Sequence, residues 1–191
     1  MATLEEVKKE VREANLVLVG LGEELSGDPR LWKELAGLLK NKDYFIVTLK
    51  DRAGLEAAGL DPERITAPLQ DPGGHKSWED YLRWLSFTLH QRLCVLELGA
   101  GFAHPQLIRF PFEKTAYFNK KARYIRISGK FPQLSEEIAD RGIPVREDPE
   151  RFFAGMTGRQ PERTAGETAA AEQPEPADEA GEAGAEKEAG A

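Results

Sequence analysis

The chain has 191 residues, of which 40% are hydrophobic, and its formal net charge is −7 at pH 7. No apolar run approaches the length of a membrane-spanning helix, about 20 residues, and no signal-peptide pattern is present, so we expect a cytoplasmic protein without membrane association. The single cysteine, Cys94, excludes an internal disulfide and a multi-cysteine metal site, and its apolar surroundings predict a buried, unreactive thiol.

The last part of the chain, residues 155–191, differs in composition from the rest. It is rich in Gly, Ala, Glu, Pro and Thr, has no aromatic residue, and carries 9 acidic against 3 basic residues. Such a segment cannot bury enough apolar surface to offset its ordering entropy, so we predict a disordered acidic tail. Residues 1–154 are then one nearly neutral domain, and its lack of a basic stripe argues against nucleic acid as a partner.

Short apolar runs alternate with helical patterns along residues 1–154. The runs predict strands at 15–19, 44–47, 93–98 and 124–127, with a weaker edge strand at 143–145, because Pro144 cannot donate to a ladder. The helical patterns fall at 4–13, 29–40, 52–58, 77–91, 105–118 and 132–141. This alternation predicts an α/β fold, a Rossmann-like and mostly parallel sheet with helices on both faces.

Particular residues predict where these helices begin and end. Asp28 can cap the helix at 29–40, with Pro29 at its first position, and Ser77 can cap the helix at 78–91. Pro105 opens another helix, which we expect Pro111 to end or kink.

Ligands of such sheets bind beyond the carboxyl ends of the strands, so the loops 20–28, 48–54 and 99–105 are the candidates. In the first loop, Gly20 and Gly22 stand between a strand and a helix, which is the context of a phosphate cradle. The third glycine of a complete dinucleotide motif is missing, and Glu23 and Glu24 would repel a pyrophosphate. A plain strand-to-helix turn is the alternative.

The other two loops offer further candidates. Asp51 could accept a hydrogen bond from a ribose hydroxyl or an amide, or it could simply cap the following helix. Gly99 and Gly101 follow a buried strand and would let the backbone approach a ligand closely. Arg109 is either an anion clamp or a salt-bridged surface residue.

No catalytic residue can be assigned from the residue pattern. The histidines His75, His90 and His104 lack the neighbours that a metal site requires, so we predict no metal. We expect His90 on a helix face, and only His104, beside the glycine turn, is placed for proton transfer near a ligand. No nucleophile elbow and no phosphate-loop lysine are present.

The order of the motifs resembles the sirtuin family of NAD-dependent protein deacylases, in particular its bacterial branch with ADP-ribosylating members. The resemblance covers about residues 14–153. It is carried by a strand ending in Gly-x-Gly at 20–22, Thr-x-x-Asp at 48–51, the stretch 57–65, and Gly-x-Gly-Phe-x-x-Pro at 99–105 followed by 108–113.

The resemblance implies NAD as the cofactor and a role for each matching residue. Gly20 and Gly22 would approach the phosphates and a ribose, and Gly99 and Gly101 would do the same from the other side. Asp51 would hold the nicotinamide end. Ser128 stands where the family has an asparagine that helps to bind the adenosine side.

The chain departs from the family at four places. Glu23 and Glu24 replace small or hydroxylated residues, and Leu49 replaces the asparagine of the nicotinamide site. The general-base histidine falls at 69–71, where this chain reads Leu-Gln-Asp, although His75 could substitute for it. The four-cysteine zinc module is missing.

Three hypotheses follow. The leading one is a reduced NAD- or ADP-ribose-binding pocket with weak or no deacylase activity, that is, a pseudoenzyme. The alternative is an active NAD-dependent ADP-ribosyltransferase or lysine deacylase that acts on a protein substrate. The third is a non-catalytic interaction protein whose acidic tail docks to a protein partner.

Overall fold

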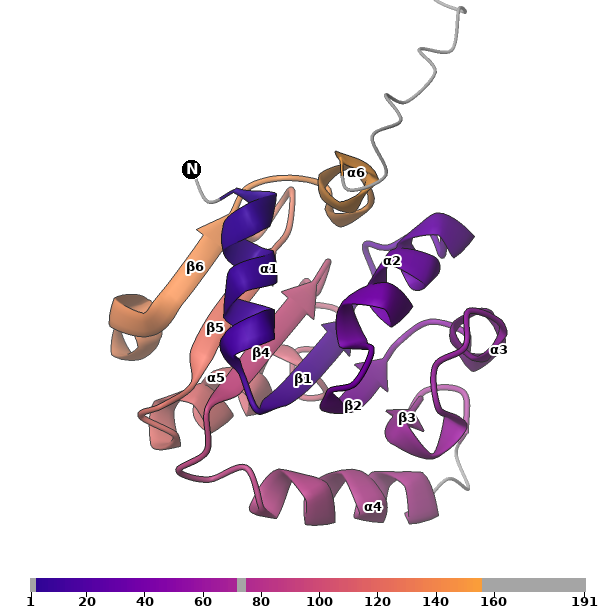
Figure 1. Cartoon of the computed structure of the whole chain (residues 1–191), viewed down its shortest axis with the longest axis horizontal. Helices are drawn as coiled ribbons and strands as arrows, with labels where there is room; N and C mark the ends of the chain where they lie inside the picture. Colours follow the sequence, from indigo (N-terminus) through magenta and orange to yellow (C-terminus); the bar gives the residue numbers. More distant parts are fainter. Residues whose placement is uncertain (1–2, 72–74, 156–191) are drawn as a thin grey trace, which may run out of the picture. The chain divides into compact units, whose positions relative to one another are not determined.

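The computed structural model describes residues 3–71 and 75–155 of the chain, and for His75 only the backbone (Figure 1). The acidic tail predicted for 155–191 therefore lies outside the described residues, apart from Gly155.

A six-stranded sheet forms the centre of the fold, with the strand order β3-β2-β1-β4-β5-β6. Every neighbouring pair is parallel, which confirms the predicted α/β class. The order runs outward in both directions from the adjacent strands β1 and β4, so the topological switch point of this doubly wound sheet lies between them. The strands are β1 Leu16–Leu21, β2 Asp43–Thr48, β3 Ile65–Thr66, β4 Leu93–Leu98, β5 Arg123–Ile127 and β6 Gly142–Val145.

Helices cover both faces of the sheet, as the alternation predicts. One hydrophobic cluster joins the sheet to α1, α2, α3 and α6, and the other joins it to α4, α5 and the 3-10 turn η2. Figure 1 shows α1 and α2 on one side of the strands and α4 and α5 on the other. The helices are α1 Leu4–Glu13, α2 Pro29–Leu39, α3 Arg52–Ala57, α4 His75–Ser86, α5 Arg109–Phe118 and α6 Pro149–Ala154, with 3-10 turns η1 Pro62–Arg64 and η2 Glu136–Arg141.

Three predicted helix boundaries on the α4–α5 face were wrong. Helix α4 begins at His75 rather than after Ser77, and it ends at Ser86. Beyond it the chain makes tight turns, and His90 has φ 67°, so this residue is not on a helix face. Helix α5 begins at Arg109 rather than at Pro105, which puts Pro111 in its first turn, where a missing N–H breaks no intrahelical bond.

Three further elements differ from the prediction. The helix expected at 132–141 is only the 3-10 turn η2. Strand β3 and helix α6 were missed, the first because two residues carry no readable pattern. The predicted edge strand is confirmed, since β6 is the last strand of the sheet.

Cys94 lies inside β4 and is fully buried, as expected. Burial raises the pKa of its thiol to about 12, so the thiolate that would react is disfavoured. Among the described residues, no helix has the length and hydropathy to cross a membrane, and no group of His, Cys, Asp and Glu side chains could hold a metal ion.

A buried ion pair joins β4 to β5 near their carboxyl ends. Glu97 and Arg126 are register partners, both are 0% exposed, and they meet through two hydrogen bonds of 2.6 and 2.9 Å. The Tyr124 hydroxyl also donates to Glu97, and Arg126 Nη1 lies 2.7 Å from Oε1 of Glu113 on α5. Burial lowers the pKa of Arg126, but Glu97, Tyr124 and Glu113 together outweigh burial and raise it, so the guanidinium stays charged.

A second arginine extends this network to the loops. Arg109 of α5 lies 3.8 Å from Glu97. Its guanidinium donates to the backbone carbonyls of Ala100, Phe131 and Gln133 at 3.0 to 3.2 Å. The network therefore fixes the loops after β4 and β5 relative to α5, and these loops border the candidate site.

We expect Glu97→Gln to destabilise the fold by about 3 kcal/mol, because it removes the fully buried counter-charge of Arg126 and leaves only the partly exposed carboxylate of Glu113. Urea unfolding followed by circular dichroism measures this loss. Glu79→Gln removes the same charge from an exposed position of α4 and should stay within about 0.5 kcal/mol of the unsubstituted chain. A Glu97→Gln variant as stable as this control would contradict the role given to the ion pair.

Candidate functional site

The loops after β1, β2, β4 and β5 meet at the carboxyl edge of the sheet, around the switch point. The backbone N–H of Gly22 donates to Leu98 O at 2.9 Å, and that of Glu24 donates to Gly99 O at 3.0 Å. The Ser128 hydroxyl donates to Glu24 at 2.9 Å. The structure thus brings together most of the sequence-predicted residues. Gly20 lies inside β1 rather than in a loop, and Gly22, Gly99, Gly101 and Ser128 lie in the loops that follow the strands.

Asp51 lies at the border of this group. Its loop is held there because Leu49 N donates to Leu21 O at 2.8 Å and Lys50 Nζ donates to Glu23 O at 2.8 Å. The Asp51 carboxylate itself is exposed and caps α3 by accepting from Ala53 N at 3.1 Å. The Lys50 ammonium is a positive charge directly beside the glycine loops.

The glycines of the first loop allow close contacts within the protein. A Cβ atom on Gly22 would lie 2.3 Å from Gly99 O and from Ala100 Cα, so the β1 and β4 loops touch backbone to backbone. A Cβ atom on Gly20 would lie 2.5 Å from Ile108 Cγ2, so a side chain there would push α5 off the sheet. Both glycines therefore have a packing role in addition to any contact with a ligand.

The carboxylate of Glu23 lies against the backbone of the glycine turn that follows β4. Its Oε1 accepts from Ala103 N at 3.0 Å, and a Cβ atom on Gly101 would lie only 2.8 Å from this oxygen. Burial raises the pKa of Glu23, but hydrogen bonds from the backbone of Glu23, Ala103 and Gly101 outweigh it, with His104 adding to them, and hold the pKa below its ordinary value of 4.5. This turn is a backbone nest for an anion, and Glu23 fills it.

A second carboxylate occupies the loop that leads into α2. Oε1 of Glu150, on α6, accepts from the backbone N–H groups of Ser26, Gly27 and Asp28 at 2.8, 3.2 and 3.4 Å. The Ser26 hydroxyl bonds both carboxylate oxygens, at 2.8 and 2.7 Å. In dinucleotide-binding folds, the turn between the first strand and its helix holds the pyrophosphate.

A third carboxylate, that of Glu24, lies between these loops and β5. One of its oxygens accepts from Ser128, whose hydroxyl in turn accepts from Phe131 N at 2.9 Å. The other oxygen, Oε1, is buried and has no hydrogen-bond partner among the described residues. An unpaired buried acceptor is costly, and a hydroxyl donor from a ligand would satisfy it.

One possibility left open by the sequence, the role of Arg109, is resolved. Arg109 is 5% exposed, and its guanidinium donates hydrogen bonds to backbone carbonyls. It therefore stabilises the loops and does not face solvent as an anion clamp. Its guanidinium also lies 4.4 Å from the centre of the Phe102 ring, which packs edge-on against Phe131. In the loop after β3, Leu69 and Gln70 are exposed, and the side chain of His75 lies outside the described residues.

Sequence reasoning missed Glu97, Arg126 and Glu150. A charged residue inside an apolar strand directly before a glycine turn requires a buried partner, and this signal could have identified Glu97. The Asp148–Pro149 pair is a helix-start signal that could have identified α6. Nothing in the sequence pattern pairs Glu150 with a loop more than 120 residues earlier.

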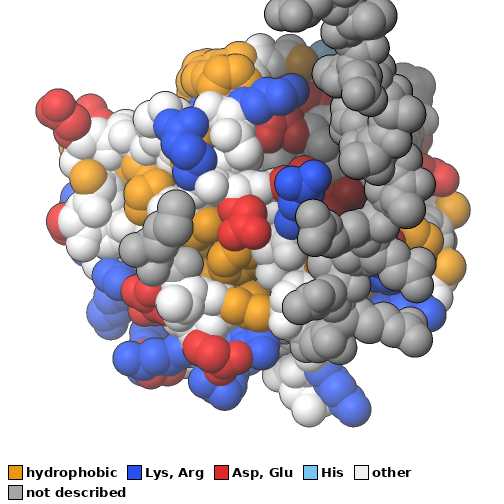
Figure 2. All heavy atoms as spheres, turned by 90° about the horizontal axis from the view of Figure 1, so that it is seen from above, with side chains coloured by type: hydrophobic (Ala, Val, Ile, Leu, Met, Phe, Trp, Pro, Cys, Tyr) orange, Lys and Arg blue, Asp and Glu red, His pale blue; other side chains and the backbone are white. Residues whose placement is uncertain are grey.

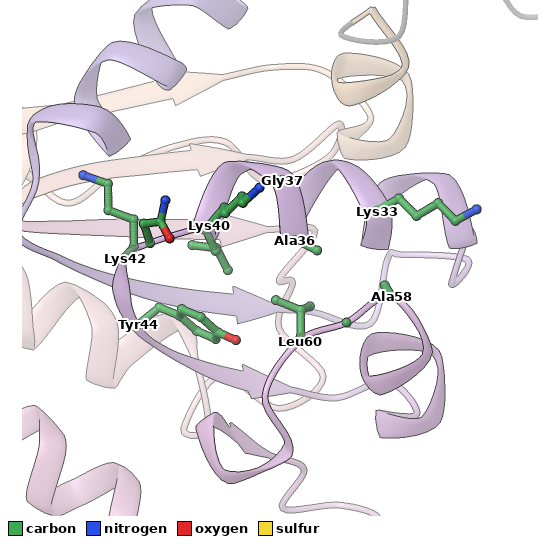
Figure 3. A pocket seen from close by; sticks show the side chains of 11 residues that line it. Lys33, Ala36, Gly37, Lys40, Lys42, Tyr44, Ala58 and Leu60 are labelled. Carbon is green, nitrogen blue, oxygen red and sulfur yellow. The ribbon is translucent and has the colours of Figure 1, made fainter.

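One face of the molecule, seen from above relative to Figure 1, is of mixed charge. In the view of Figure 2, red and blue side chains lie next to each other and around hydrophobic ones, in the part of this face that is not grey. A cavity of about 540 Å³ lies elsewhere, between the end of α2, the start of β2 and residues 58–60 (Figure 3). No residue of the glycine loops lines it, and Lys42 beside it donates to the carbonyls of Arg12 and Ala14.

Comparison with curated proteins gives a distant similarity. No family model matches the chain. A protein ADP-ribosyltransferase of Staphylococcus aureus (strain Mu50) is 26% identical over 80 residues, which are 42% of this chain and 25% of that protein. The chain thus matches about a quarter of the length of this relative.

We expect Glu23→Gln to lower the free energy of unfolding by about 1 kcal/mol near pH 7, because a neutral amide accepts the nest hydrogen bonds less strongly. The folded-state pKa of Glu23 lies below 4.5, so its stabilising contribution is present above that pH and is lost as the pH falls through the folded value. Urea unfolding at about pH 7 and about pH 3 should show the difference between the two proteins shrinking on acidification.

An exposed carboxylate provides the control for this pH series. Glu137→Gln should change stability little at either pH, since Glu137 is exposed on η2. A Glu23→Gln difference that stays constant across the series would contradict a charged Glu23 in the nest.

Proposed function

We propose that the chain binds NAD or another ligand bearing ADP-ribose at the switch point of its sheet, in a sirtuin-like pocket of reduced size. One observation carries this proposal. Two nests of backbone N–H groups, at 26–28 and 101–103, flank the place where the strand order reverses, and each already holds an anion of the protein. Backbone donors in this position of a doubly wound fold suit the two phosphates of a dinucleotide.

The sequence-predicted residues take defined roles in this proposal. Gly20 and Gly22 on one side, with Gly99 and Gly101 on the other, bring backbone close to the phosphates. Asp51 and Ser128 supply side-chain contacts to ribose hydroxyls, which requires Ser128 to leave Glu24. The backbone donors can bind a diphosphate only after the carboxylates of Glu23 and Glu150 have turned out of their nests. While these carboxylates stay in place, they reduce the space in the pocket.

We propose that deacylation is weak or lacking. This reaction needs a general base beside the ribose. Where the family has its histidine, this chain has Leu69 or Gln70, and neither side chain can take up a proton near neutral pH.

A second candidate is NAD-dependent ADP-ribosyl transfer to a protein. The similarity to a protein ADP-ribosyltransferase favours it, although that similarity covers only 80 residues. The bond between the ribose and nicotinamide would break, nicotinamide would leave, and a nucleophile of the partner protein would bond to the ribose carbon and lose its proton. Nicotinamide release in the presence of lysate proteins, abolished by Asp51→Asn, would establish this candidate over pure binding.

We expect calorimetric titration with ADP-ribose and with NAD to show saturable binding below about 1 mM, a weak affinity that reflects the two carboxylates to be displaced. Gly101→Ala should abolish it, because the added methyl group would lie 2.8 Å from the position that Glu23 Oε1 now occupies and that a phosphate oxygen of the ligand would have to take. Gly37→Ala is the matched control, since a Cβ atom on Gly37 of α2 meets nothing within 4 Å. If millimolar ligand produces no heat and no thermal shift, the proposed function is wrong, and a non-catalytic interaction protein is left as the alternative.

A further inference from the structure

Helix α6 places a carboxylate in the loop where the proposed ligand needs a phosphate. We propose that Glu150 is an internal competitor for this anion site, so that a ligand phosphate and the Glu150 carboxylate exclude each other at Ser26, Gly27 and Asp28. This autoinhibitory contact rests on the proposed function, because it regulates the same pocket.

The loop at 26–28 is shaped around the carboxylate. Three successive N–H groups and the Ser26 hydroxyl converge on Glu150. Gly27 has φ 94°, a left-handed conformation, yet a Cβ atom there would meet nothing within 4 Å. The need for a glycine here is therefore not due to lack of space for a side chain. It follows from the left-handed backbone conformation, which turns the successive N–H groups toward one anion.

Helix α6 does not depend on Glu150 for its place in the fold. Phe152 and Phe153 are buried in the hydrophobic cluster on the α1–α2 face, and Pro149 is buried as well. The side chain of Asp148 caps the helix by accepting from Arg151 N at 3.0 Å. The Glu150 side chain is half-buried at the rim, so it can rotate into water while the helix stays docked.

The neighbouring carboxylates add to the effect of Glu150, because they also oppose the binding of an anion while Glu150 lies in its nest. Glu23 fills the second nest, and Glu24 faces the same region with a buried oxygen that has no partner among the described residues. Three carboxylates at one edge repel a diphosphate. Two cations are bonded to this loop, Lys50 through Glu23 O and Arg30 through the Asp28 carboxylate. Removal of one carboxylate should therefore strengthen binding of anions.

The test compares variants in calorimetric titrations with inorganic pyrophosphate and with ADP-ribose. Glu150→Ala should bind both about tenfold or more tightly than the unsubstituted chain, because the nest is then free. Glu150→Gln keeps the shape of the side chain without its charge and should give an intermediate gain. Glu147→Ala removes an equal charge from an exposed position three residues away and should change affinity much less.

A further variant tests the donors themselves. Adding Ser26→Ala to Glu150→Ala removes the hydroxyl of the nest and should reverse part of the gain. Thermal unfolding of every variant shows whether it is folded.

The outcomes separate this inference from the proposed function. If the unsubstituted chain and both Glu150 variants bind ADP-ribose with equal affinity, Glu150 does not compete with the ligand, but the proposed function stands. An equal gain in Glu147→Ala would also overturn the competition, since long-range charge would then be the cause. No binding of either probe by any variant would overturn both.

Discussion

The bidentate ion pair between Glu97 and Arg126 is the interaction on which the geometry of the site depends. Two opposite charges with no exposure to solvent are tolerated only when each satisfies the other, so adjacent strands, and through Glu113 helix α5, are locked in one arrangement. Arg109 then uses the same network to fix the loops after β4 and β5. The buried charged residues Glu97, Arg126 and Arg109 thus stabilise the position of the glycine turn at 99–101.

That rigid edge presents backbone donors, and the chain supplies its own anions to them. Glu23 and Glu150 each accept several N–H groups in loops where nucleotide-binding folds place phosphates. The sequence alone suggests that the glutamates of the first loop only repel a cofactor. The structure shows two carboxylates held by backbone N–H groups, and under the proposed function they stand in for the phosphates of that cofactor.

Much of the fold could be predicted because its signals are local. Periodicity identified the strands, and Asp28 with Pro29 marked the start of α2 correctly. Strand β3 escaped because two residues have no period, and α4 ends before its apolar pattern does. Of the site, the meeting of the glycine loops follows from parallel topology, whereas Glu150 reaches its loop through a long-range contact that no local pattern encodes.

In the proposed binding mode, the phosphates of the ligand enter the two nests and expel the carboxylates of Glu23 and Glu150. Two-dimensional ¹H–¹⁵N NMR during an ADP-ribose titration tests it most directly, because each nest amide gives its own signal. We expect the largest shifts at the amides of Ser26, Gly27, Gly101 and Ala103. Shifts confined to the cavity beside Lys42, or none at millimolar ADP-ribose, would contradict it.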